Sequence, residues 1–151
     1  MTNEARIHIV AQPERLYGLV SDVTRMGEWS PETVGADWLD GALGPAVGAR
    51  FKGRNKRRLS WATTSTVTAA DPGRRFSFAT GKAPDTTWTY TFAPAGDGTD
   101  VTESFEITKP PGALGRFLCR LALGISWSER ETDLVRSMEQ TLNRLKAEAE
   151  G

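Results

Sequence analysis

The sequence has one cysteine, Cys119, and one histidine, His8, among its 151 residues. A single cysteine excludes an internal disulfide framework and is typical of a protein in a reducing compartment. The same scarcity argues against a metal site built from several His and Cys ligands, and against Cys–His catalysis. We therefore expect no metal and no cofactor, with His8 facing solvent and Cys119 packed as a small apolar residue.

The chain also lacks net charge, a leader-like segment and a long apolar run. Nineteen basic residues balance nineteen acidic residues, so no overall field attracts nucleic acid or an anionic membrane. Residues 1–6 are polar and contain no signal-peptide core. The most apolar stretch, Leu114 to Trp127, is interrupted by Arg116 and Arg120 and is too short to span a bilayer. These features predict a cytoplasmic protein without stable membrane insertion.

Aromatic side chains, in contrast, alternate along strand-like runs. Trp88, Tyr90 and Phe92 occupy every second position, which places the three rings on one face of a strand. The same alternation recurs in the preceding run with Phe76 and Phe78, and in the following run with Phe105 and Ile107. A curved sheet with one aromatic face, covered by a single helix, is predicted to leave space for a hydrophobic small molecule.

The order of the elements follows from hydrophobic period and turn residues. Ala5 to Ala11 alternates as a strand, Pro13 begins a helix, and Asp22 caps a second short helix that ends at Ser30-Pro31. Six further strands with short connections are predicted to pair as an antiparallel meander. They are Val34–Leu39, Ala49–Asn55, Leu59–Ala69, Arg75–Thr80, Thr86–Ala93 and Asp100–Thr108.

Helical spacing dominates the end of the chain. Leu134, Met138, Leu142 and Leu145 fall on one face of a predicted long final helix. Ser128 and Glu131 have the spacing of a capping box, which predicts a break between Gly124 and Ser128. No linker or repeat divides the chain, so residues 1–151 are expected to form one α+β domain.

Three local segments carry a resemblance to a known family. They are Ser21–Glu32, Val47–Asn55 and Thr141–Lys146. With the element order, these segments resemble the polyketide cyclase/dehydrase branch of the SRPBCC (START-like) helix-grip superfamily. The resemblance implies a seven-stranded curved antiparallel sheet wrapped around a long C-terminal helix, with two short helices after the first strand. It also implies a cavity for lipids, sterols or polyketides. No catalytic residue set is shared across the superfamily, so none is transferred.

The predicted cavity wall combines aromatic and small polar side chains. Large rings can also be solid core, but five tryptophans in so short a chain are hard to pack around one helix. An apolar wall with a few hydroxyl groups is typical of a ligand pocket. The predicted ligand contacts are Trp29, Trp61, Thr63, Ser65, Phe76, Phe78, Trp88, Tyr90, Glu103, Phe105, Phe117, Leu121, Trp127 and Met138.

Glu103 is the one candidate for proton transfer. It alternates with Val101, Phe105 and Ile107, which places a carboxyl group on the face expected to be buried. Desolvation there would raise its pKa and allow it to act as a proton donor or base. Two other interpretations stay open, in which Glu103 lies at the rim of the sheet or pairs with an arginine for structural reasons.

Two surface features also have alternative interpretations. The basic residues between positions 50 and 58 predict a solvated strand face, with RNA or anionic lipid as the other possibility. These residues are Arg50, Lys52, Arg54, Lys56, Arg57 and Arg58. The apolar segment Gly112 to Trp127 is predicted to be buried, to form a gate over the cavity, or to make a dimer contact.

Three functions follow from this pattern, in order of preference. The first is binding, with transport as an open alternative, of a hydrophobic or aromatic small molecule such as a lipid or polyketide. The second is a polyketide cyclase or dehydratase that acts on a poly-β-keto substrate, with Glu103 moving protons. The third is a protein-interaction module. In each case we expect a monomer or weak homodimer, with no nucleic acid partner.

Overall fold

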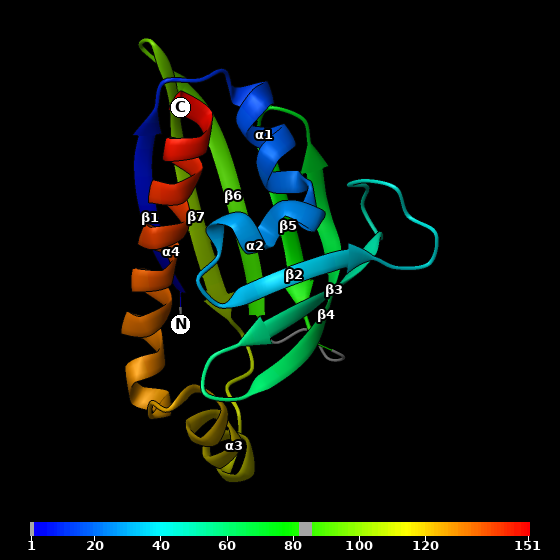
Figure 1. The fold of residues 1–151 in the computed structure, drawn as a ribbon, viewed down its shortest axis with the longest axis vertical. Helices are drawn as coiled ribbons and strands as arrows, with labels where there is room; N and C mark the ends of the chain where they lie inside the picture. Colours follow the sequence, from blue (N-terminus) through cyan, green and yellow to red (C-terminus); the bar gives the residue numbers. More distant parts are fainter. Residues whose placement is uncertain (1, 82–85) are drawn as a thin grey trace.

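A computed structural model describes residues 2–81 and 86–151. Within these residues seven strands form one antiparallel sheet, in the order β1-β7-β6-β5-β4-β3-β2 (Figure 1). The pairing is a meander from β2 to β7, to which β1 adds beside β7. The strands are β1 (Thr2–Ile9), β2 (Thr33–Trp38), β3 (Arg50–Lys56), β4 (Ser60–Asp71), β5 (Arg75–Thr80), β6 (Thr86–Ala95) and β7 (Gly98–Ile107).

The helices lie mainly on the concave side of this sheet (Figure 1). Between β1 and β2 the chain forms α1 (Pro13–Ser21), a 3-10 turn η1 (Val23–Arg25) and the short α2 (Met26–Trp29). After β7 come α3 (Ala113–Leu123) and the long α4 (Trp127–Glu150). The predicted helix-grip architecture is confirmed, with its curved seven-stranded sheet, long C-terminal helix and short helices after the first strand.

The aromatic alternation predicted for the central strands is present. In the β6–β7 register Trp88 lies opposite Phe105, Tyr90 opposite Glu103 and Phe92 opposite Val101. All of these side chains are buried except that of Trp88, which is half-buried. The concave face therefore has one apolar layer, against which the helices pack.

The final helix buries the face that its spacing predicts. Leu134, Met138, Leu142 and Leu145 are at most 4% exposed. Gly124 ends α3 in the left-handed conformation, with φ of 79°, which a glycine adopts at little cost. The predicted break is present, because α3 ends at Leu123 and α4 begins at Trp127, but the capping box is wrong because Ser126 precedes the helix in place of Ser128. Ser128 already lies inside the helix, and its hydroxyl pairs with that of Ser126 at 2.9 Å.

Strand boundaries differ from the predictions where pairing with a neighbouring strand, and not the local alternation of side chains, determines where a strand begins or ends. β1 pairs with β7 from Thr2, opposite Glu106, to Ile9, so it begins and ends earlier than the alternation predicts. A bulge in β2 lies between Thr33 and Gly35. Val34, the predicted first residue of that strand, is consequently 62% exposed.

Gly27 allows α2 to pack closely against β2. A Cβ atom at this position would lie 2.5 Å from the carbonyl oxygen of Val34, a backbone atom that cannot move aside alone. Gly18 in α1 has no atom within 4 Å of its would-be Cβ. Because α2 contributes Met26 and Trp29 to the cavity described below, this close approach positions part of the site.

The two glycines provide a matched pair of substitutions. Gly27→Ala is expected to lower the free energy of unfolding by about 1–3 kcal/mol, because the methyl group overpacks the α2–β2 contact. Gly18→Ala should raise it by about 0.5–1 kcal/mol through helix propensity. Urea unfolding followed by circular dichroism measures both. Equal effects of the two substitutions would contradict the tight approach of α2.

None of the helices in residues 2–81 and 86–151 has both the length and the apolar character needed to cross a membrane.

Candidate functional site

A cavity of about 510 Å³ lies between the concave face of the sheet and helices α2, α3 and α4. Four of the five tryptophans line it, which are Trp29, Trp61, Trp88 and Trp127. Trp29 is only 4% exposed, whereas Trp61 and Trp88 are half-buried. Indole rings from α2, from strands β4 and β6 and from the start of α4 thus line one space.

Ten of the fourteen predicted contacts line this cavity. They are Trp29, Trp61, Thr63, Ser65, Phe78, Trp88, Tyr90, Glu103, Trp127 and Met138. They come from α2, β4, β5, β6, β7 and α4, and the fold brings them together because alternate residues of neighbouring strands share the concave face. Their role as ligand contacts stays a prediction.

The structure places the other four predicted residues outside the cavity lining. Phe76 is fully buried and packs edge-on against Tyr17 of α1, with ring centroids 6.4 Å apart, so it belongs to the core. Phe105 is 1% exposed and packs against the ring of Trp88 at 5.6 Å. Phe117 and Leu121 lie on the outer face of α3 and are 61% and 47% exposed.

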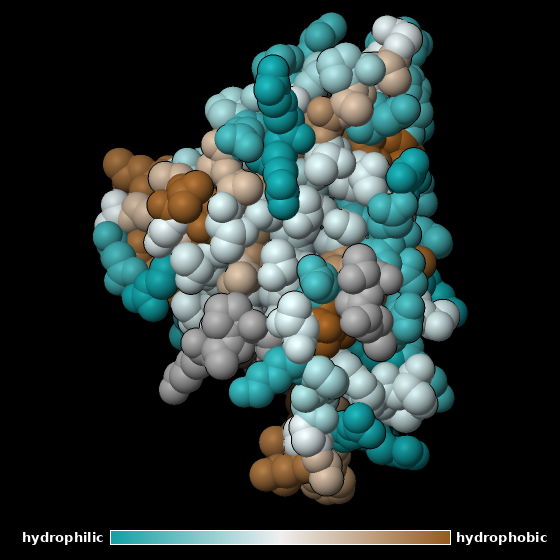
Figure 2. Space-filling view, turned by 180° about the vertical axis from the view of Figure 1, so that it is seen from behind, coloured by the Kyte–Doolittle hydropathy of each residue, from teal (hydrophilic) through white to brown (hydrophobic). Residues whose placement is uncertain are grey.

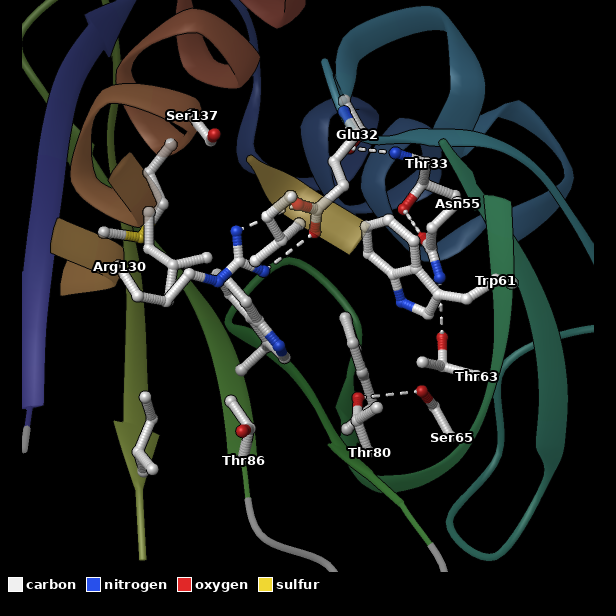
Figure 3. A pocket seen from close by; sticks show the side chains of 18 of the residues that line it. Glu32, Thr33, Asn55, Trp61, Thr63, Ser65, Thr80, Thr86, Arg130 and Ser137 are labelled. Atoms are coloured by element: carbon white, nitrogen blue, oxygen red, sulfur yellow. Dashed lines mark hydrogen bonds and ion pairs between the residues drawn. The ribbon is translucent and has the colours of Figure 1, made fainter. Parts of the chain in front are cut away.

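Hydroxyl and amide groups form a polar wall along β2 to β5 (Figure 3). The Thr33 hydroxyl donates to Asn55 Oδ1 at 2.8 Å, and Asn55 Nδ2 donates to the Thr63 hydroxyl at 3.1 Å. The Ser65 and Thr80 hydroxyls pair at 2.9 Å. Because the Thr63 hydroxyl accepts from Asn55, its own proton is available to an acceptor in the cavity.

Sequence reasoning missed Thr33, Asn55 and Thr80 as members of this wall. A usable signal was present for Asn55, since it shares the inward face of β3 with Phe51 and Gly53. Asn55 is only 6% exposed, and a buried amide needs hydrogen-bond partners that neighbouring strands can supply. Thr33 carried no such signal, because the β2 bulge next to it changes the alternation.

Glu103 lies inside the protein, as its position in the alternation predicts. It is 4% exposed, and Tyr90 donates a 2.8 Å hydrogen bond from its hydroxyl to Oε1. Its other oxygen, Oε2, is shielded from solvent and has no hydrogen-bond partner within the described residues. Its polar neighbour is thus a tyrosine rather than an arginine, and it does not lie at the rim.

Burial determines the protonation state of this carboxyl group. Desolvation raises the pKa of Glu103 to about 8, although the Tyr90 hydrogen bond opposes the rise. Burial and the adjacent Glu103 also raise the pKa of Tyr90 well above its ordinary value. Glu103 is therefore mostly neutral at pH 7. Because Oε1 accepts from Tyr90, the carboxyl proton is expected on Oε2, the oxygen that needs an acceptor.

A compact ion-pair cluster lies beside the cavity and was not predicted. Arg130 of α4 donates to both carboxylate oxygens of Glu32, at 2.9 and 3.1 Å, and to Asp133 at 2.6 Å. Arg57, from the β3–β4 hairpin, donates to both oxygens of Asp133 at 3.0 and 3.2 Å. Burial raises the pKa of Asp133, but the hydrogen bonds from Arg57 and Arg130 outweigh this effect and lower it. The cluster ties α4 to the hairpin and to the segment before β2, and Arg130 and Glu32 line the cavity.

The basic residues between positions 50 and 58 are therefore not one free patch. The first three alternate on the outer face of β3, as predicted, and two of them pair with acids. Arg50 pairs with Asp40, and Arg54 pairs with Asp37. With Arg57 held in the cluster, three of the six basic residues are neutralised locally.

The single histidine and the single cysteine have different surroundings. His8 faces solvent, as predicted, but it has two partners that sequence reasoning missed, Asp97 and Asp100 at 2.9 and 2.8 Å. Hydrogen bonds to Asp100 and Asp97 raise the pKa of His8. Cys119 lines the cavity, and burial raises the pKa of its thiol, which disfavours a reactive thiolate. In residues 2–81 and 86–151 no three His, Cys, Asp or Glu side chains are grouped to hold a metal ion.

The fold and cavity define the class of protein, a helix-grip domain, and solved structures support this assignment. CV1439 from Chromobacterium violaceum has a TM-score of 0.71 and 20% identity over 99% of this chain and 98% of that chain. The di-domain ARO/CYC StfQ of the steffimycin biosynthetic pathway has a TM-score of 0.77 and 17% identity over 99% of this chain and 50% of that chain. The Polyketide_cyc-like protein Cgl2372 from Corynebacterium glutamicum is 33% identical, with a TM-score of 0.53, over 99% and 85% of the two chains.

The family is shown by the sequence itself. Residues 2–150 match the family described as polyketide cyclase / dehydrase and lipid transport, and the chain belongs to this family. The resemblance inferred from the three local segments is thereby confirmed. No curated protein sequence matches the chain significantly.

The raised pKa of Glu103 predicts a specific pH dependence of stability. A carboxyl group with a folded pKa near 8 and an ordinary pKa near 4.5 holds its proton more tightly when folded. The free energy of unfolding should therefore fall as pH rises from about 4.5 to 8, by roughly 5 kcal/mol at most.

Glu103→Gln removes this ionisation while it keeps the side-chain shape. Relative to the variant, the unmodified protein should lose stability steadily between pH 5 and pH 8, as measured by urea unfolding at each pH. Parallel stability curves for the two proteins would show that Glu103 ionises at an ordinary pKa.

Proposed function

We propose that the protein binds a hydrophobic, ring-containing small molecule with oxygen substituents, of the lipid-like or polyketide-like kind. The observation that carries this proposal is the 510 Å³ cavity, lined by four tryptophans together with polar groups. Its volume falls in the range of about 300–1,000 Å³ typical of small-molecule pockets, and its composition is also typical. Contact with the aromatic walls would supply most of the affinity, at about 25 cal/mol per Å² of apolar surface buried.

Two polar regions favour oxygen on more than one edge of the ligand. The hydroxyl and amide wall comes from β2 to β5, whereas Glu103 and Tyr90 come from β7 and β6. A saturated hydrocarbon would leave the orphan Oε2 of Glu103 without a partner, at a cost in free energy. A ligand with a carbonyl group can accept the proton of Oε2, which supports an oxygenated ring system over a plain acyl chain.

The remaining expectations on context stay predictions. We propose that the chain acts as one ligand-binding domain in the cytoplasm, without a nucleic acid partner, as a monomer or weak homodimer. Native mass spectrometry of protein purified from its own host, with a search for a co-purifying small molecule, would identify the ligand class directly.

Substitution of the cavity tryptophans tests the binding proposal. Trp61→Ala and Trp88→Ala should each weaken binding of 1,8-dihydroxyanthraquinone about tenfold or more, because loss of an indole contact removes about 1–3 kcal/mol. Isothermal titration calorimetry measures the dissociation constants. Trp38→Ala is the matched control, since Trp38 packs against Phe51 and does not line the cavity. Unchanged affinity in both cavity variants, with intact circular dichroism spectra, would refute this binding site.

A cyclase or dehydratase is the second candidate function, and the state of Glu103 favours it. A neutral carboxyl group in an apolar site can protonate a ketone oxygen while a carbon nucleophile adds to the carbonyl carbon. The resulting carboxylate can then take the proton released from that carbon nucleophile, which restores the neutral acid. The net reaction is an intramolecular aldol addition on a poly-β-keto chain, in which the cavity holds the reacting carbons together.

Glu103→Gln separates catalysis from binding. The amide retains the shape of the site but cannot transfer the proton, so turnover of a synthetic poly-β-keto thioester should fall at least a hundredfold, within the range of about 10²–10⁴ that acid–base groups supply. Ligand affinity should change far less. Turnover by the unmodified protein should also decline as pH rises through about 8, where Glu103 loses its proton. Equal turnover with and without the carboxyl group would remove Glu103 from the reaction.

A further inference from the structure

Helix α3 exposes an apolar face to solvent. Four large side chains recur at positions i, i+3, i+4 and i+7, which places them on one side of the helix. They are Leu114 (72% exposed), Phe117 (61%), Leu118 (52%) and Leu121 (47%). Figure 2 shows hydrophobic residues at the lower end of the molecule, where α3 lies in Figure 1. We call these four residues the α3 apolar face.

The same helix closes part of the cavity. Gly115, Cys119, Ala122 and Leu123 line the cavity, and Leu118 reaches both the cavity and the surface. The α3 apolar face is therefore the outer side of a wall that is about one helix thick. A partner that covers this face would lie next to the ligand chamber.

Basic side chains surround the α3 apolar face. Residues 109–124 contain Lys109, Arg116 and Arg120 and no acidic residue, although the whole chain is neutral. The β3–β4 hairpin adjoins the end of α3, because the Leu59 amide donates to the Ala122 carbonyl at 2.9 Å. The hairpin brings two further basic residues to this end of the molecule, Lys56 and Arg58.

These basic residues differ from those that the structure neutralises. Lys56, Arg58, Lys109, Arg116 and Arg120 are all exposed, and none forms an ion pair within residues 2–81 and 86–151. Arg50, Arg54 and Arg57, in the same region of the sequence, do pair with acids. Five basic side chains that no acid within the described residues neutralises are thus gathered around α3.

We propose that the α3 apolar face docks on the surface of an anionic lipid bilayer. Helices that lie in a membrane interface combine an apolar face with flanking Lys and Arg. They bind because the apolar face is buried among the acyl chains and the basic residues are attracted to anionic lipid headgroups. Each basic residue near an anionic surface strengthens such binding roughly fivefold. The length of α3, eleven residues, fits shallow insertion along the interface.

Charge favours a bilayer over a second copy of this chain. A two-fold symmetric contact through α3 would bring the same patch of both copies together, basic residues against basic residues. An anionic lipid surface supplies both partners that the patch lacks, acyl chains for the leucines and phenylalanine, and phosphates for the arginines and lysines. Docking through the α3 apolar face is independent of which ligand the cavity holds.

Vesicle co-sedimentation tests the proposal with the full chain. The protein should bind vesicles of phosphatidylcholine mixed with phosphatidylglycerol, and bind vesicles of phosphatidylcholine alone at least tenfold more weakly. High salt should reduce the difference, because it screens the charges. Leu114→Glu and Phe117→Glu should each weaken binding to the mixed vesicles tenfold or more, and Arg116→Ala with Arg120→Ala should abolish most of the preference for anionic lipid.

Leu43→Glu is the matched control. Leu43 is 98% exposed in the β2–β3 connection, and its substitution adds the same negative charge at a place away from α3. It should leave vesicle binding within about twofold, the change expected from one charge outside the patch. All the substituted residues are exposed, and an unchanged melting temperature checks that each variant is folded.

Absence of binding to the mixed vesicles, or equal binding by Phe117→Glu, would overturn the proposal. Light scattering that shows a dimer broken by Phe117→Glu, without vesicle binding, would assign the face to self-association instead.

Discussion

The cavity depends on where α4 packs against the curved sheet. Helix α4 makes its main contacts with β1, while α1 covers β5 and β6 and the segment of η1 and α2 covers β2 (Figure 1). The inner face of the sheet is therefore covered at its two edge strands, and at its middle only where α1 lies. One layer of side chains from the strands cannot fill the space that remains. Voids larger than a water molecule are rare in close-packed interiors. A 510 Å³ space lined by half-buried tryptophans is accordingly a property of this arrangement and not of a local packing fault.

The charged cluster and the polar wall keep that space open at defined places. Arg130, Glu32, Asp133 and Arg57 join three segments that are far apart in sequence, and breaking such a cluster would leave partly buried charges uncompensated. The Thr33–Asn55–Thr63 bonds likewise connect three adjacent strands across their inner face. Polar groups that are already satisfied by one another can still offer hydroxyl protons or lone pairs to a ligand. The polar wall thus holds the strands together and can also form hydrogen bonds with a ligand.

Period and turn residues were enough to predict the elements and their order, because alternation in β6 and β7 and the spacing in α4 are local properties of the chain. The assembly of these elements into a helix-grip fold was implied by the family resemblance. The same local reasoning placed Glu103 inside. It failed where structure depends on distant segments: the β2 bulge, the start of β1 at Thr2, and the Arg130 cluster all result from pairing between parts of the chain that no local pattern connects. It also assigned Phe76 and Phe105 to the cavity, since alternation gives the face of a strand but not the distance along it at which helices α1 and α4 cover that face.

Glu103 shows most clearly that stability alone does not explain the interior. A methionine at this position would avoid the desolvation that raises the pKa to about 8, and would avoid a shielded oxygen without a partner. Buried polar atoms of native proteins are nearly always hydrogen-bonded, so each exception needs a reason. Here the exception belongs to a residue that lines a cavity, and its neighbour Tyr90 fixes which oxygen accepts and which is free to donate. A carboxyl group held neutral and oriented in this way is an incomplete hydrogen-bonding site, and an acceptor oxygen on a bound molecule is the group that completes it.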